Sequence, residues 1–313
     1  MKYLFGPVVS RRLGVSLGVD VMPHKFCNMD CVYCEIGVTT NLISKRAECT
    51  PTKEIVAELD EYLSRNPKLN FITFSGCGEP TAHLGLSRTI QFIRKRYPRY
   101  KICLITNSTF LDFADEYLLD LDVVMPSLDS AVETTFTKIN RAQKSFTAKK
   151  VIENLIDFRA KMRGQMWLEV FVVSGLNDTQ NEIEALAEAI KKIKPHKVQL
   201  NTLDRPPTES WIKRPSFKTL GEIAKAFSPA KVEIVAKYPK LSFQRVKEGS
   251  LSDDILENVK HRPLTKAELA ENLHLKQSVL ETMLTRLQTD GKISIESHQR
   301  GDFVRIKKSG GKL

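Results

Sequence analysis

Six short apolar segments, separated by amphipathic helical segments, are the feature that most constrains the fold of this chain. Repeated strand-helix units favour a parallel sheet with right-handed crossovers. Six units fall short of the eight that close a full (β/α)8 barrel. The sequence therefore predicts an α/β fold built on a partial, open (β/α)6 barrel. The predicted strands cover residues 15–23, 70–75, 101–108, 122–129, 166–173 and 196–201.

Three of the six cysteines, Cys27, Cys31 and Cys34, follow the first predicted strand in the spacing C-x3-C-x2-C. Three thiolates leave one iron of a four-iron cluster without a protein ligand, so a coordination position stays open for chemistry. A zinc site would normally need a fourth Cys or His, and His24 does not lie in a second ligand pair. A disulfide framework does not suit a long chain with few cysteines and no secretion signal. The spacing favours the cluster over these two alternatives.

The second predicted strand opens directly into Gly76-Cys77-Gly78-Glu79-Pro80. Glycines let main-chain groups approach a ligand closely, and a carboxylate can hold an ammonium group. An ordinary turn is the alternative explanation. Because this loop follows the cysteine motif along the chain, we interpret it as part of a ligand site.

These motifs, in this order, resemble those of the radical S-adenosylmethionine (radical SAM) superfamily. The last cysteine follows an aromatic residue, and Ser-Gly-Cys-Gly-Glu-Pro-Thr is one residue longer than the plain Gly-Gly-Glu-Pro motif. The resemblance implies a [4Fe-4S] cluster on the three cysteines, which binds SAM and cleaves it to a 5′-deoxyadenosyl radical. It also implies SAM contacts: Tyr33 near the adenine, Gly78 and Glu79 at the amino group, and Asn107, Ser127 and Asp129 at the carboxylate or ribose.

Within the superfamily, the motif order resembles most a subgroup related to the wyosine-type tRNA-modifying synthases. Asn140-Arg141 and the run Leu-Asn-Thr-x-Asp-Arg-Pro at residues 200–206 contribute to this resemblance. Those enzymes add a second cluster and a catalytic lysine. Here Cys49, Cys77 and Cys103 are scattered and form no second triad. That departure argues against the wyosine reaction itself.

Several polar residues near the predicted strands indicate a polar barrel interior. Glu169 lies in an apolar run and must be paired or face polar surroundings, because an unpaired buried charge is costly. Gln199 and Asn201 alternate with apolar neighbours, so both can face the interior. Arg11 and Arg12 precede the first predicted strand and face either a phosphate-bearing substrate or solvent.

From Asp253 the pattern changes to three helices followed by two short strands. Thr265 and Glu268 form a capping-box pattern at the start of the second helix. This order resembles a winged helix-turn-helix domain. Its third helix carries one Arg and one Glu, which leaves DNA, RNA and protein open as ligands. The predicted domains are a radical SAM barrel at 1–205, a barrel flank and linker at 206–249, and the winged helix at 250–313.

The net charge of +11 favours an acidic partner such as RNA, DNA or a phosphorylated substrate, with a solvated basic surface as the alternative. No apolar run approaches a membrane span, and the first residues lack a signal-peptide pattern. We therefore expect a cytoplasmic protein with reduced cysteines and no membrane partner.

The function that the resemblance implies is a radical SAM enzyme that abstracts hydrogen from an unidentified substrate, either RNA/tRNA or a peptide. Such an enzyme takes its electron from a donor such as a flavodoxin or a ferredoxin. An alternative of another class is an iron-sulfur transcriptional regulator that acts through the winged helix. In a third hypothesis, the winged helix holds the leader of a peptide that the enzyme modifies.

Overall fold

The computed structural model describes residues 1–10, 12–235, 251–260, 262–273, 275, 277–298 and 301–307. Arg11 and residues 236–249 of the predicted flank and linker therefore lie outside the described residues. Among the described residues, no helix is long and apolar enough to cross a bilayer.

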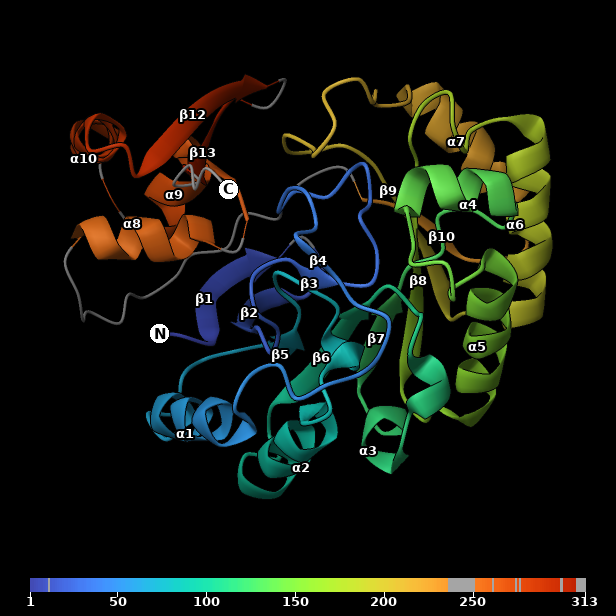
Figure 1. Ribbon diagram of the computed structural model, residues 1–313, viewed down its shortest axis with the longest axis horizontal. Helices are drawn as coiled ribbons and strands as arrows, with labels where there is room; N and C mark the ends of the chain where they lie inside the picture. The colour runs from blue at the N-terminus through green and yellow to red at the C-terminus, as the bar shows by residue number, and fades with distance from the viewer. Residues whose placement is uncertain are drawn as a thin grey trace.

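The centre of the molecule is an eight-stranded sheet (Figure 1). Its first two strands are antiparallel, and every later neighbour pairs in parallel. The order runs from β1 at one edge to β10 at the other, so the described sheet is open. The strands are β1 Leu4–Ser10, β2 Gly14–Val19, β5 Phe71–Phe74, β6 Lys101–Thr106, β7 Val123–Pro126, β8 Gln165–Phe171, β9 Lys197–Asn201 and β10 Val232–Ile234.

All six predicted strands are present, and the sheet has two further strands, one at each edge. The residues before β2 are predicted from the sequence as an extended approach with a break at Gly6-Pro7, and not as a strand of the barrel. β1 nevertheless pairs with β2 by shifting its register between Phe5 and Val8. At the other edge, β10 pairs with β9, so the sheet continues beyond the predicted barrel boundary at residue 205.

Helices cover the outer face of the sheet (Figure 1). Each one buries an apolar stripe, as Ile55, Leu59 and Leu63 do on α1. The polar sequence at Asn140-Arg141 predicts a loop, but Asn140 is the last residue of a short helix, α4 Glu133–Asn140. The other outer helices are α1 Thr52–Leu63, α2 Leu86–Arg96, α3 Glu116–Leu119, α5 Ala148–Lys161, α6 Gln180–Ile193 and α7 Phe217–Ala226.

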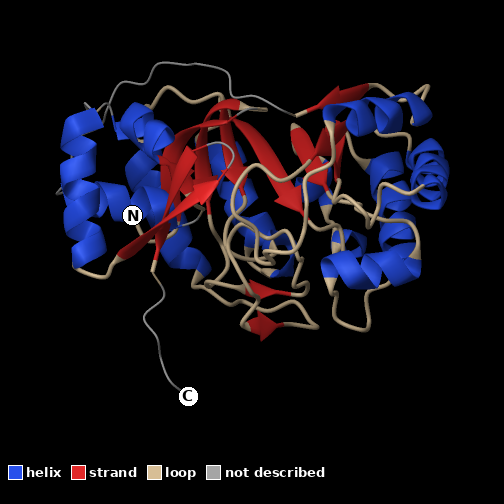
Figure 2. Cartoon of the chain, turned by 90° about the horizontal axis from the view of Figure 1, so that it is seen from above, coloured by secondary structure: helices blue, strands red, loops and turns tan. Residues whose placement is uncertain are grey.

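The carboxyl ends of the strands carry long loops, which crowd together over the middle of the molecule (Figure 2). The cysteine segment between β2 and α1 contains two short parallel strands, β3 Phe26–Cys27 and β4 Asn41–Leu42. Short helical turns follow two strands, η1 Pro80–Ala82 after β5 and η2 Leu111–Phe113 after β6. Parallel-sheet enzymes place their sites at this end of the sheet.

The C-terminal unit has its own apolar core, which includes Ile255, Leu269, Leu284 and Val304. Its three strands are antiparallel in the order β11-β13-β12. The three predicted helices and two predicted strands are present, together with the short strand β11. The elements are α8 Leu251–Lys260, β11 Leu264–Thr265, α9 Lys266–Leu273, α10 Gln277–Thr289, β12 Ile293–His298 and β13 Gly301–Ile306.

The predicted capping box at the start of α9 is confirmed. The Glu268 backbone N–H donates to Thr265 Oγ1 at 3.1 Å, and the Thr265 N–H donates to Glu268 Oε2 at 2.9 Å. We expect Thr265→Ala to destabilise α9 by about 1 kcal/mol, because the helix loses a side-chain cap. Amide hydrogen exchange in α9 should then be about fivefold faster. Thr282→Ala, at an exposed position of α10, is the matched control and should leave these rates unchanged. Equal rates in both variants would contradict the prediction.

Candidate cluster and cofactor site

Each cysteine of the motif receives an N–H donor from a different part of the fold. Asn107 Nδ2, just beyond β6, lies 3.7 Å from Cys27 Sγ. Asn140 Nδ2, at the end of α4, lies 3.4 Å from Cys31 Sγ. Lys25 Nζ, at the start of the cysteine segment, lies 3.2 Å from Cys34 Sγ. Such donors stabilise sulfur that carries negative charge, as it does when it binds a metal.

The chemistry of the three thiols fits an iron cluster better than a single ion or a disulfide. All six cysteines are free. Burial raises the pKa of the Cys27 thiol to about 12 and that of Cys31 well above its usual value, so without metal both hold their protons. In the part of the chain that the structure describes, no three His, Cys, Asp or Glu side chains surround one ion position. A four-iron cluster does not need that geometry, because its ligands bind different irons.

The glycine loop after β5 lies directly against the cysteine segment. The Lys25 N–H donates to the Cys77 carbonyl at 3.0 Å. A Cβ atom at Gly78 would lie 2.0 Å from the Phe26 carbonyl oxygen, so only glycine fits at that position. Gly78 thus brings the backbone of the two predicted motifs together.

Glu79 is buried, with 2% of its surface exposed, and its carboxylate has several donors. Oε1 accepts from Thr81 N at 2.9 Å and from the hydroxyls of Thr81 and Thr106 at 2.5 and 2.6 Å. Oε2 accepts from Asn107 N at 2.6 Å. Burial raises the pKa of Glu79 against the effect of these hydrogen bonds. A carboxylate oxygen can accept more than one hydrogen bond, so Oε2 keeps capacity for a further donor.

Asn107 connects the Glu79 loop with the cysteine segment. Besides its contact with Cys27, its Nδ2 donates to Asn28 Oδ1 at 2.6 Å, while its Oδ1 accepts from the Thr109 hydroxyl at 2.7 Å. Ser127 is half-buried at the end of β7. The structure shows no hydrogen bond from its hydroxyl to another described side chain.

Asp129 is the centre of a second group of contacts, next to Cys31. Its Oδ2 accepts from the Tyr33 hydroxyl at 2.5 Å and from Asn140 Nδ2 at 2.6 Å, and its Oδ1 accepts from Phe171 N at 2.9 Å. The Tyr33 ring stacks on Phe171 with centroids 3.9 Å apart. Burial raises the pKa of Asp129 to about 6. Contacts within the protein therefore engage the Tyr33 hydroxyl, one face of the Tyr33 ring and both carboxylate oxygens of Asp129.

The structure thus brings the predicted residues together in two groups, Cys27 with Asn107 and Glu79, and Cys31 with Asp129 and Tyr33. Sequence reasoning missed Lys25 and Asn140 as donors to sulfur, although both lie within or beside the motifs that we identified. Asn140 Oδ1 is buried and has no hydrogen-bond partner among the described residues. A water or a ligand beside Cys31 can supply the missing donor.

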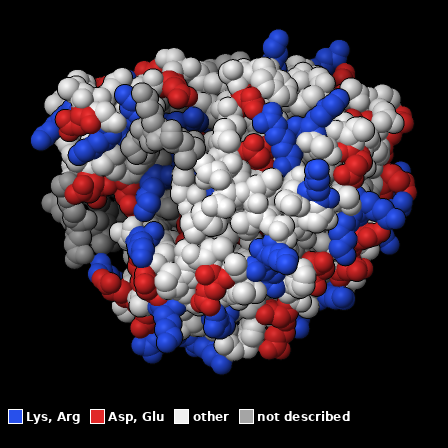
Figure 3. All heavy atoms as spheres, in the orientation of Figure 1, with Lys and Arg blue, Asp and Glu red and all other residues white. Residues whose placement is uncertain are grey.

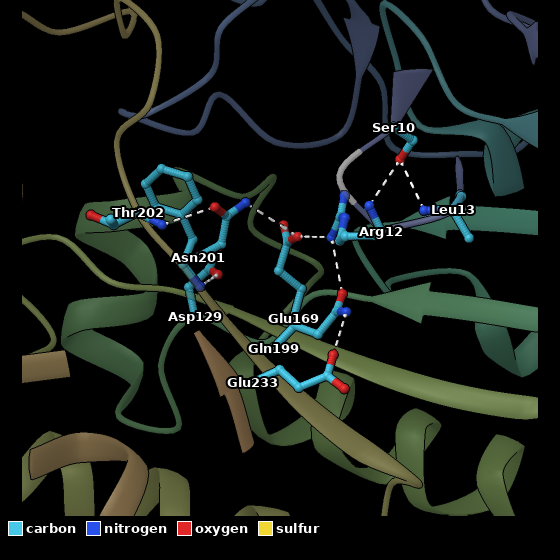
Figure 4. Close-up of polar contacts among 10 residues, drawn as sticks. Ser10, Arg12, Leu13, Asp129, Glu169, Gln199, Asn201, Thr202 and Glu233 are labelled. Atoms are coloured by element: carbon cyan, nitrogen blue, oxygen red, sulfur yellow. Dashed lines mark hydrogen bonds and ion pairs between the residues drawn. The ribbon is translucent and has the colours of Figure 1, made fainter. Parts of the chain in front are cut away.

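The barrel interior below these groups is polar, as predicted (Figure 4). Arg12 extends from the β1–β2 turn to form an ion pair with Glu169 of β8. Its Nη1 also lies 3.4 Å from Gln199 Oε1, and Asn201 Nδ2 lies 3.3 Å from Glu169 Oε2. The expectation that Glu169 must be paired is confirmed. Arg12, predicted to face substrate or solvent, instead has a carboxylate partner inside the barrel.

Comparison with known proteins identifies the family. Residues 21–190, just over half of the chain, match the family model described as the Radical SAM superfamily. The chain belongs to this superfamily. It is therefore an enzyme, and radical SAM enzymes use a [4Fe-4S] cluster and SAM.

Relatives with curated descriptions extend the match over most of the chain. UPF0026 protein MJ1312 of Methanocaldococcus jannaschii is 32% identical, over 94% of this chain and 95% of its own length. A Brachyspira hyodysenteriae protein named GTPase Obg is 35% identical over 94% of this chain, but the chain spans only 44% of that relative. A more distant relative, the probable dual-specificity RNA methyltransferase RlmN of Enterococcus faecalis, is 24% identical over 62% of this chain and 58% of its own.

A solved structure shows the same fold. The crystal structure of a radical SAM methyltransferase from Sphaerobacter thermophilus matches with a TM-score of 0.54 and 16% identity. The match covers 70% of this chain and 65% of that chain. It bears out the parallel α/β sheet that the radical SAM resemblance implied.

Proposed function

We propose that Cys27, Cys31 and Cys34 hold the [4Fe-4S] cluster and that SAM binds beside it. The observation that carries this proposal is the set of three N–H donors, one to each sulfur. When bound, the cluster supplies the electron that cleaves SAM. The protein places the cofactor and keeps water away from it.

We assign the SAM contacts to polar atoms that can form a further hydrogen bond. Glu79 Oε2 can accept the ammonium group next to its bond from Asn107 N. The half-buried hydroxyl of Ser127 can donate to the carboxylate or bind the ribose. Asn140 Oδ1, which has no partner among the described residues, suits a hydroxyl of the ribose, because an amide oxygen only accepts hydrogen bonds. Asp129 acts through Tyr33 and Asn140, which it holds by hydrogen bonds of 2.5 and 2.6 Å. Tyr33 contributes an aromatic edge for the adenine.

For the substrate we propose RNA, with tRNA as the first class to test. The net charge of +11 and the similarity to an RNA methyltransferase support this choice. Figure 3 shows uncharged atoms in the middle of one face, with Lys and Arg mixed with Asp and Glu around them. We further propose that residues 251–307 form a winged helix that helps to hold the RNA, since their element order supports it. A cytoplasmic flavodoxin or ferredoxin would supply the electron.

The proposed function predicts SAM cleavage and hydrogen transfer from RNA. The protein is reconstituted with iron and sulfide without oxygen, reduced with dithionite and given SAM, and 5′-deoxyadenosine is measured by chromatography. Deuterated total RNA should then transfer deuterium into the 5′-deoxyadenosine, whereas a deuterated peptide pool should not. Absence of 5′-deoxyadenosine would overturn the enzymatic proposal, and deuterium from peptides alone would overturn the choice of RNA.

A further inference from the structure

Residues 205–209, which follow β9, lie beside Cys34 and hold the backbone at the end of the cysteine motif. Glu209 N donates to the Val32 carbonyl at 3.1 Å, and Thr208 Oγ1 donates to the Cys34 carbonyl at 2.8 Å. Arg205 Nη1 lies 3.2 Å from Glu35 Oε2, on the residue that follows Cys34. Three successive contacts therefore hold the end of the cysteine motif from one side.

The C-terminal unit also contacts Glu35 and the segment after β9; Figure 1 shows the position of this unit beside the barrel. Arg305 Nη2 of β13 donates to the Pro206 carbonyl at 3.0 Å and to the Glu35 carbonyl at 3.4 Å. Glu268, whose Oε2 forms the capping box of α9, lies with its Oε1 3.6 Å from Arg205 Nη2. The unit that follows the barrel thus reaches residues immediately next to Cys34.

Arg205 joins these contacts because it lies between two carboxylates from different parts of the chain. Its side chain is 2% exposed, while those of Glu35 and Glu268 are 29% and 13% exposed. A buried guanidinium is stable only when carboxylates pair with it, and the two carboxylates repel each other without it. Loss of Arg205 would therefore loosen both Glu35 and the contact with the C-terminal unit.

We propose that Arg205 is a positioning residue that ties the Cys34 end of the cluster motif to the C-terminal unit, so that cluster retention depends on that unit. This inference rests on the proposed function, since it takes Cys34 as a cluster ligand. Residues that orient metal ligands typically change metal affinity 10- to 100-fold when they are replaced. A structural change in the C-terminal unit would reach the Cys34 end of the motif through three side chains, Glu268, Arg205 and Glu35.

The test measures iron release from the reconstituted full-length protein to a ferrous chelator without oxygen, together with the electron paramagnetic resonance spectrum of the reduced cluster. Arg205→Met should release iron about tenfold or more faster than the wild type and alter the spectrum. Arg205→Lys, which keeps the charge, should restore part of the retention. Glu268→Gln should accelerate release severalfold, although it leaves every barrel residue in place.

Arg163→Met is the matched control, because it removes an exposed ion pair with Asp120 at 2.8 Å, between residues that follow α5 and α3. It should release iron at the wild-type rate. Thermal unfolding of each apoprotein separates a local effect from misfolding. Wild-type rates and spectra in both Arg205→Met and Glu268→Gln would overturn the inference alone. A wild-type protein that retains no cluster would overturn the proposed function, and the inference with it.

Discussion

Replacing Cys31 with alanine should remove both cluster binding and SAM cleavage. Cys31 is the middle ligand of the proposed motif, and a cluster held by two thiolates has lost a third of its protein ligands. We expect iron content close to background and 5′-deoxyadenosine formation lowered by on the order of 10³-fold or more, because the cleaving electron comes from the cluster. Iron analysis and chromatography of the reaction products measure the two effects.

Cys103→Ala provides the control for this experiment. Cys103 is fully buried, but it packs with Leu13, Val123 and Met125 in an apolar cluster and not with the motif. This substitution should lower stability modestly and leave the iron content unchanged. Retention of iron by the Cys31 variant, or equal loss in both variants, would contradict the ligand assignment.

Replacing Asp129 should have the second large effect, this time on stability and on its pH dependence. Alanine leaves the Tyr33 hydroxyl and Phe171 N–H without their acceptor in a buried place, which we expect to cost about 3 kcal/mol in the free energy of unfolding. The measurement is denaturant unfolding of the apoprotein at pH 5 and at pH 7.5.

The pH dependence follows from the pKa of Asp129, which burial raises to about 6. Between the usual carboxyl pKa and 6, the folded protein binds more protons here than the unfolded chain does. The stability that this group contributes is therefore present at low pH and lost as pH rises through 6. The cost of Asp129→Ala should be smaller at pH 7.5 than at pH 5, by on the order of 1 kcal/mol.

Asp129→Asn is the matched control, because asparagine keeps an acceptor and does not titrate in this range. The stability difference between the Asn and Ala variants should be the same at both pH values. A cost of Asp129→Ala that rises with pH would show that the carboxylate, and not the acid, is the form that the folded protein favours.

The strands could be predicted because each is a run of apolar residues buried between layers, as in Phe71–Phe74 and Val123–Pro126. The residues of β10 were predicted as a strand in the flank after residue 205 and not among the six strands of the barrel, because three half-buried residues do not indicate where a strand pairs. α4 was missed for a related reason. Its sequence ETTFTKIN contains two threonines in a row and only two large apolar residues that become buried, Phe136 and Ile139.

The site could be predicted as a set of residues but not as a set of contacts. Asn107 and Asp129 were expected near the cysteines because the resemblance to radical SAM enzymes implies it, and both follow parallel strands, which end at the same edge of a sheet. Their partners come from distant parts of the chain, since Phe171 lies 42 residues from Asp129 and Asn28 lies 79 residues from Asn107. Strand periodicity carries no information about such pairs.

Lys25 has a consequence for electron transfer. Its side chain is almost fully buried and its ammonium nitrogen lies 3.2 Å from Cys34 Sγ. Adding an electron makes an iron-sulfur cluster more negative, and a positive charge fixed against one of its sulfurs favours that reduced state. The Lys25 ammonium would therefore raise the reduction potential of a cluster bound by Cys34. A higher potential makes it easier for a donor of modest reducing power to deliver the electron.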